Sequence, residues 1–186
     1  GVRAGQWIAI YGAGGLGNLA VQYAAKVFNA RVIAVDINDD KLDLAKKVGA
    51  EFTVNAAKED AAERIKEITG IGAHAAMVTA VSKAAFNSAI DCVRAGGRVV
   101  AVGLPVETMD LSIPRTVLDG IEVVGSLVGT RQDLAEAFDF GARGVVVPVV
   151  QTRALDEVGD IFEEMHAGKI QGRIVLDMKK SCGHNH

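Results

Sequence analysis

Hydrophobic residues alternate between two patterns along the chain. Short continuous apolar runs, such as residues 7–11 and 31–35, are typical of parallel strands that are buried on both faces. Between such runs the apolar positions repeat every three or four residues, as from Leu16 to Val27, which is the spacing of one helix face. This alternation predicts an α/β fold, a doubly wound parallel sheet with helices on both faces.

The same two patterns place further elements over most of the chain. Strands are expected at residues 6–11, 31–35, 52–54, 75–79, 98–102, 121–125, 145–150 and 173–177. Helices are expected at residues 16–27, 39–48, 59–69, 82–93, 132–140 and 155–167.

A glycine-rich loop joins the first strand to the first helix. Residues 12–17 read G-x-G-x-x-G, with an additional glycine at the fourth place. In this pattern Gly12 makes the tight turn, Gly14 lets the backbone approach a pyrophosphate, and Gly17 lets the helix pack closely on the strand. The N–H groups at the start of the helix attract the anion. The strand before and the helix after the loop favour a dinucleotide site over a plain turn.

An acidic residue, Asp36, ends the second strand, 19 residues after Gly17. A carboxylate at this place accepts hydrogen bonds from the ribose hydroxyls of NAD. It would repel the 2′-phosphate of NADP by about 1–4 kcal/mol at 4 Å, depending on the dielectric. No basic residue follows until Lys41, so the sequence predicts NAD. The alternative is that Asp36 caps the helix that follows it.

Groups that could carry out catalysis are scarce. Hydride transfer needs a base or a Lewis acid at the substrate oxygen. His74 and His166 lie next to a strand and near a helix end, where capping or solvation is the expected role. Tyr11 and Tyr23 belong to the first strand and helix, not to a short-chain-reductase motif. We therefore expect no catalytic residue in this chain.

Metal ligands are scarce as well. Cys182, His184 and His186 alternate near the end of the chain, and an extended segment would present all three on one face. Structural zinc normally has four ligands on ordered elements, so we expect a mobile end rather than a metal site.

Composition excludes several classes of protein. The chain has 186 residues, of which 49% are hydrophobic and 23% charged, with a net charge of −3. Such a chain can form a core, which excludes disorder, and its apolar runs are too short to span a membrane. The pI near 5.8 does not suggest nucleic-acid binding. Two cysteines far apart favour a reducing compartment, the cytoplasm.

Several motifs in a fixed order resemble one known family. The stretch from Gly5 to Asp177 resembles the cofactor-binding half of a zinc-dependent alcohol dehydrogenase of the medium-chain dehydrogenase/reductase superfamily, most of all the bacterial propanol-preferring members. The motifs that carry the resemblance are residues 12–17, 35–42, 47–50, 96–104, 125–131 and 168–173.

The resemblance implies a role for each matching residue. Asp36 and Lys41 would hold the adenosine ribose, and Arg173 would reach the pyrophosphate, for which its guanidinium fork is suited. Val128 would face the nicotinamide carboxamide. The full set of implied cofactor-binding residues is Gly12, Gly14, Gly15, Leu16, Gly17, Asp36, Lys41, Thr79, Val102, Gly103, Leu104, Val128 and Arg173.

The resemblance also implies what lies outside the chain. The family holds its zinc with cysteines and a histidine of another domain, so this segment alone is expected to bind NAD(H) without oxidising an alcohol to an aldehyde. The expected parts are a Rossmann domain at 1–144, a segment at 145–178 that packs on it or on the absent domain, and a disordered tail at 179–186. The strand at 121–127 would pair with a second copy, giving a homodimer or homotetramer.

Three other interpretations stay open at this stage. One is a stand-alone dinucleotide-binding module without catalysis. Another is a methyltransferase that binds S-adenosylmethionine, against which the third glycine counts because that ligand has no pyrophosphate. A zinc-independent quinone reductase of the same superfamily would generally prefer NADP and would not place Asp at position 36.

Overall fold

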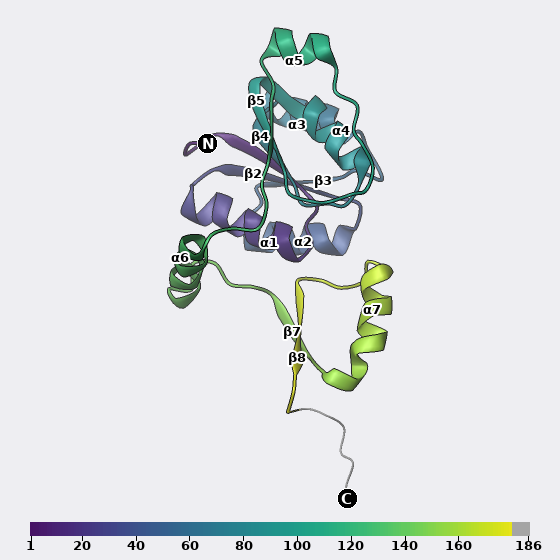
Figure 1. Ribbon diagram of the computed structural model, residues 1–186. Helices are drawn as coiled ribbons and strands as arrows, with labels where there is room; N and C mark the ends of the chain where they lie inside the picture. Colours follow the sequence, from purple (N-terminus) through teal and green to yellow (C-terminus); the bar gives the residue numbers. More distant parts are fainter. Residues whose placement is uncertain (180–186) are drawn as a thin grey trace, which may run out of the picture.

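A six-stranded parallel sheet forms the centre of the computed structural model, which describes residues 1–179 (Figure 1). The strand order is β3-β2-β1-β4-β5-β6, the order of a doubly wound dinucleotide-binding fold. The predicted fold class is therefore confirmed. The strands are β1 (Trp7–Tyr11), β2 (Arg31–Asp36), β3 (Phe52–Asn55), β4 (Ala73–Val78), β5 (Val93–Ala101) and β6 (Glu122–Gly125).

Helices cover both faces of this sheet. Neighbouring residues of β1 therefore enter different cores: Tyr11 belongs to the same core as Ile65, whereas Ile10 belongs to the core that contains Leu42. Burial on both faces explains why the strands read as continuous apolar runs. The helices are α1 (Gly15–Gln22) and α2 (Asp39–Val48) on one face, and α3 (Ala61–Thr69) and α4 (Lys83–Cys92) on the other.

The first helix changes its hydrogen bonding part-way. We expected one helix over residues 16–27, but α1 ends at Gln22 and a π-helical turn follows at Tyr23–Val27. The ring of Tyr23 meets that of Phe140 edge-on, with 5.6 Å between centroids. The turn therefore lies where the first helix meets the C-terminal part of the chain.

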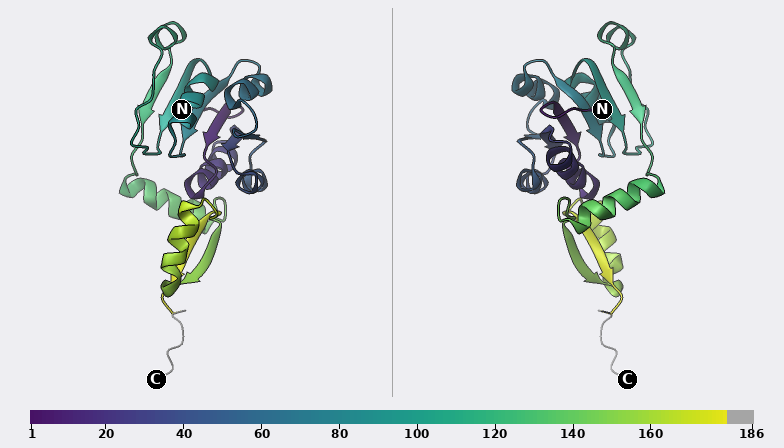
Figure 2. Two further views of the ribbon diagram at one scale, coloured as in Figure 1. Left: turned by 90° about the vertical axis from the view of Figure 1, so that its right-hand side faces the viewer. Right: turned by 90° about the vertical axis from the view of Figure 1, so that its left-hand side faces the viewer.

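The chain that follows helix α6 (Arg131–Ala142) forms a separate unit beneath the main sheet (Figure 2). Its two strands pair with each other in parallel and do not join the main sheet. We call residues 145–179 the C-terminal lobe. The elements of the lobe are β7 (Val150–Ala154), a 3₁₀ turn (Leu155–Glu157), α7 (Val158–His166) and β8 (Arg173–Asp177).

The strand predicted at residues 145–150 does not form there; the strand of this region lies at Val150–Ala154. Strand β7 begins only at Val150, because the backbone before it bonds elsewhere. The N–H of Val145 donates to the carbonyl of Phe140 at the end of α6, and Val147 bonds to the side chain of Gln22. The backbone of this run therefore bonds to the main domain instead of pairing as a strand, and of its side chains that of Val146 is buried.

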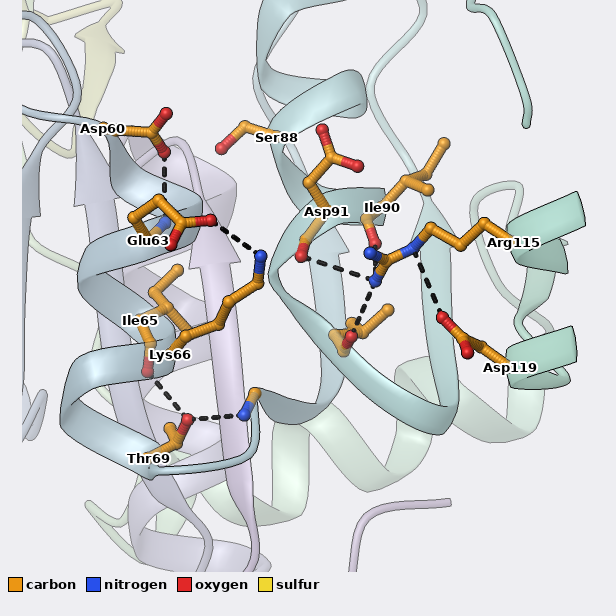
Figure 3. Close-up of polar contacts among 12 residues, drawn as sticks. Asp60, Glu63, Ile65, Lys66, Thr69, Ser88, Ile90, Asp91, Arg115 and Asp119 are labelled. Carbon is orange, nitrogen blue, oxygen red and sulfur yellow. Dashed lines mark hydrogen bonds and ion pairs between the residues drawn. The ribbon is translucent and has the colours of Figure 1, made fainter.

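Helix α5 (Ile113–Asp119) was not predicted from the sequence. The side chain of Ser112 accepts from the N–H of Arg115, and proline in the first turn favours a helix start. The Arg115 guanidinium then donates to the carbonyls of Ile90 and Val93, at 3.1 and 2.9 Å, and so ties α5 to the end of α4 (Figure 3). The available signal was Ser112 with a proline two residues later.

None of the helices in residues 1–179 combines the length and the apolar character that crossing a bilayer would require.

Candidate cofactor site

Two glycines of the loop let β1 and α1 approach each other. A Cβ atom on Gly17 would lie 1.7 Å from the carbonyl oxygen of Gly12, so only glycine fits there. Gly12 itself has a φ of 91°, and a Cβ on it would lie 2.8 Å from the backbone nitrogen of Ala80. The start of α1 is thus held tightly against the ends of β1 and β4.

The second glycine of the loop faces open space instead. Gly14 is the N-cap residue of α1, and a Cβ on it would meet no described atom within 4 Å. No side chain of the described residues caps this helix start, whereas Asn38 and Asp60 cap α2 and α3. The first N–H groups of α1 therefore point to a surface where a ligand can accept from them.

The carboxylate of Asp36 lies beside the same loop. Its Oδ2 accepts from the N–H of Ala13 at 2.7 Å, and its Oδ1 accepts from the N–H groups of Ile37 and Asn38, at 2.8 and 3.1 Å. The alternative interpretation of Asp36 as a helix cap is wrong, because the side chain of Asn38 caps α2. Lys41 stands in the first turn of that helix.

An arginine from the C-terminal lobe also reaches the loop. Arg173, the first residue of β8, lies against Gly15: a Cβ on that glycine would be 2.5 Å from Nε and 2.7 Å from Cζ of the arginine. The predicted residues Asp36 and Arg173, 137 positions apart in the sequence, thus both lie against one loop. A carboxylate and a guanidinium at the same loop suit a ligand with sugar hydroxyls and phosphates.

The loops after β4 and β5 complete this edge of the sheet. The hydroxyl of Thr79 lies 2.9 Å from the carbonyl oxygen of Gly12. The N–H of Gly103 donates to Val78 at 2.9 Å, and a Cβ on Gly103 would lie 2.3 Å from the carbonyl oxygen of Ala80. Leu104 follows with an exposed side chain.

A cavity of about 1390 Å³ adjoins the start of α1. Its floor is the face of β1, β4 and β5 that carries apolar side chains, such as those of Ile10, Met77 and Val100. Four predicted cofactor-binding residues share its wall; they are Leu16, Thr79, Val102 and Val128. Asp36, Lys41 and Arg173 are not part of the wall, so the predicted residues fall into two groups around the glycine loop.

Val128 has an unfavourable backbone conformation. Its φ is 49°, in the left-handed region, which a β-branched residue rarely adopts, and its side chain is almost fully exposed. Strain of this kind persists where surrounding structure imposes it and clusters at ligand sites.

The histidines of the described chain have structural partners. Nδ1 of His74 accepts from the N–H of Trp7 at 3.2 Å, so it joins β4 to β1 rather than capping a helix. Burial first, and then the nearby Arg94 charge, lower the pKa of His74 below its ordinary 6.5. Nδ1 of His166 lies 2.8 Å from the carbonyl oxygen of Phe162 in its own helix.

No group of three metal-ligating side chains occurs within residues 1–179. The cluster of Cys182, His184 and His186 lies outside the described residues. The described part of the chain therefore does not fit a zinc ion.

Sequence reasoning missed one polar pair beside the site. Asn18 and Gln22 are both 1% exposed, and the amide of Gln22 bonds to the backbone of Val147. The signal was available, because two amides four residues apart on a helix share one face.

The comparison with known families shows to which protein family the chain belongs. The model of the zinc-binding dehydrogenases matches residues 15–143, well over half of the chain. This chain belongs to the zinc-binding dehydrogenase family. The methyltransferase interpretation is therefore wrong.

Solved structures of dehydrogenases have the same fold. The alcohol dehydrogenase of the hyperthermophilic archaeon Aeropyrum pernix is 34% identical with a TM-score of 0.89, over 94% of this chain and 51% of that one. Benzyl alcohol dehydrogenase from Acinetobacter calcoaceticus is 26% identical with a TM-score of 0.85, over 95% of this chain and 51% of that one. Acetophenone reductase from Geotrichum candidum, solved with NAD, is 26% identical with a TM-score of 0.81, over 97% and 51%. This chain thus spans about half the length of these three solved proteins.

Proposed function

We propose that this chain is the NAD(H)-binding part of an alcohol dehydrogenase that transfers a hydride between a primary or secondary alcohol and NAD. The proposal extends to the bacterial propanol-preferring type, which the sequence motifs favour. The family match and the alcohol dehydrogenases among the similar structures support the reaction class. The NAD complex of the similar acetophenone reductase supports the cofactor.

One observation carries the cofactor assignment. The backbone of Gly14 faces open space at an uncapped helix start, with the Asp36 carboxylate and Arg173 against the same loop. The pyrophosphate would accept from the first N–H groups of α1 and from the guanidinium. The adenosine ribose would donate to Asp36, with Lys41 beside it.

The nicotinamide half would lie toward the cavity. Leu16, Thr79, Val102 and Val128 line its wall, and Gly103 and Leu104 follow at the same edge. A mostly apolar wall suits a planar ring and excludes water from it. When bound, NAD supplies the hydride acceptor; this chain's residues bind and orient it.

We propose that zinc chemistry comes from residues outside this chain. The described residues offer no set of metal ligands, and the similar dehydrogenases are about twice as long. This segment alone should therefore bind NAD(H) without oxidising an alcohol.

The proposed assembly is a homodimer or homotetramer joined through β6. This strand is an edge of the main sheet, and the side chains of Val124 and Leu127 near it are exposed. Unpaired strand edges are templates for pairing with a second chain. Light scattering of the purified chain tests the assembly.

The free, buried thiol of Cys92 supports the cytoplasm as the compartment.

Calorimetric titration of the chain with NADH, and in parallel with NADPH, tests the function. We expect NADH to bind and NADPH to bind at least tenfold more weakly, because of the Asp36 charge. Absence of NADH binding by a chain that melts cooperatively would contradict the proposal.

A further inference from the structure

One buried side chain fastens the C-terminal lobe to the main domain. Gln22, the last residue of α1, donates from Nε2 to the carbonyl oxygen of Val147 at 2.8 Å. Its Oε1 accepts from the N–H of the same residue at 2.9 Å. The amide thus pairs with both backbone groups of one residue, as a neighbouring strand would.

The orientation of this amide is fixed by its other neighbours. Nε2 also donates to Oδ1 of Asn18 at 3.1 Å, and Oε1 also accepts from Nζ of Lys26 at 3.3 Å. Both amide hydrogens and both oxygen lone pairs are therefore used. A buried amide with every partner satisfied holds a single geometry.

The contact continues from Val147 to the site. Two residues further on, the carbonyl oxygen of Val149 accepts from the N–H of Arg173 at 2.8 Å. A Cβ on Gly172 would lie 2.2 Å from that same oxygen, so the chain before β8 presses closely on Val149. The guanidinium of Arg173 then lies against Gly15.

Two hydrogen-bonded segments of the lobe therefore contact α1, one at each end of the helix. Gln22 contacts one segment at the end of the helix, and Gly15 the other at the start, about 10 Å away at the rise of an α-helix. The π-helical turn begins at the very next residue, Tyr23, and such turns are frequent at functional sites.

We infer that Gln22 is a positioning residue for the cofactor: by fixing Val147 it holds the lobe where Arg173 reaches the pyrophosphate. The inference rests on the proposed NAD site. Gln22 touches no ligand itself and acts through Arg173.

A double-mutant cycle on NADH binding tests this role. The dissociation constant is measured by NADH fluorescence for the unaltered chain, Gln22→Met, Arg173→Met and the double variant. We expect each single change to weaken NADH about tenfold and the double change to weaken it no more than Arg173→Met alone. Adenosine, which lacks the pyrophosphate, should bind all four chains equally. Gln132→Met is the matched control, since the exposed Gln132 amide bonds to Glu136 within α6 and takes no part in the Gln22 network, and it should change NADH binding less than twofold.

The outcomes separate the two proposals. If Arg173→Met leaves NADH binding unchanged, the proposed pyrophosphate site is wrong. If Arg173→Met weakens binding but Gln22→Met does not, or if the two losses multiply, the inference about Gln22 is overturned. Should Gln22→Met not fold, Gln22→Asn replaces it, because its amide is one methylene too short to make both bonds. If neither folds, the residue is structural only and the inference is likewise overturned.

Discussion

The carboxylate of Asp36, at the end of β2, accepts a 2.7 Å hydrogen bond from the backbone N–H of Ala13 inside the glycine loop. This bond links the acidic residue directly to the glycine loop. It makes the loop and the proposed ribose contact one hydrogen-bonded unit, and holding such groups in place reduces the cost of ordering on binding.

Replacing the charge but keeping the shape tests cofactor selectivity. We expect Asp36→Asn to weaken NADH about tenfold, since a hydrogen bond to a charged group contributes about 1.5–3 kcal/mol. NADPH should lose less or gain, because the repulsion of its 2′-phosphate is removed. Competitive titrations of both nucleotides measure the ratio. Asp39→Asn, which removes a nearby exposed charge paired with Lys58, is the control and should leave the ratio unchanged. Equal losses for both nucleotides would sink the ribose assignment.

Two glycines of the loop should differ in how much stability is lost on replacement by alanine. Gly17→Ala puts a Cβ 1.7 Å from the oxygen of Gly12, which is backbone and cannot yield, so we expect a loss of about 3 kcal/mol in the free energy of unfolding. Gly15→Ala meets only the flexible side chain of Arg173 and should change stability by less than about 0.5 kcal/mol. Urea unfolding followed by the fluorescence of the buried Trp7 measures both. A Gly17→Ala variant as stable as the unaltered chain would contradict the close contact between α1 and the Gly12 backbone.

The strained residue Val128 offers a stability test. Asparagine tolerates the left-handed region far better than a β-branched residue, so Val128→Asn should raise the free energy of unfolding by about 1 kcal/mol. The same change should weaken NADH, because Val128 lines the proposed nicotinamide side of the cavity. Thermal melts and titrations of one sample measure the two effects. A variant that is less stable and binds NADH as well as before would contradict both parts.

Stability should fall in mild acid through His74. Its Nδ1 accepts a hydrogen bond from Trp7, which only the unprotonated ring can do, and burial lowers its pKa below 6.5. The unfolded state therefore binds the proton more readily, and the stabilisation present above about pH 6.5 is lost as the pH falls toward the folded-state pKa. Arg94 is the charged group that adds to this shift. In His74→Gln, whose side-chain oxygen can accept the same bond, this part of the pH dependence should disappear from urea midpoints measured between pH 5 and 8. An unchanged slope would assign the acid sensitivity to other groups.

The main sheet was predictable because its strands are buried on both faces, which leaves a continuous apolar run such as residues 31–35. The glycine loop was predictable because Gly12 and Gly17 are forced by backbone contacts. The start of β7 was not, because the run before it bonds to Gln22, 125 positions away, and no local pattern reports such a partner. Helix α5 was missed because it buries no residue and is held by Arg115 instead of an apolar face.

The contact of Arg173 with Gly15 was neither readable from a local sequence pattern nor missed entirely. A basic residue near the chain end has no local pattern that aims it at the first helix. Only the resemblance to a family suggested the role, and the path through Val147 and Val149 supplies its physical basis.

The most direct test of the proposed site is calorimetric titration of NADH into the unaltered chain and into Gly14→Ala. The added methyl group meets no atom of the described chain within 4 Å, so the melting temperature should not change. It would occupy the space assigned to the pyrophosphate, so we expect NADH to bind the unaltered chain and to bind Gly14→Ala at least tenfold more weakly. Equal affinity in the two chains at equal melting temperature would contradict the site.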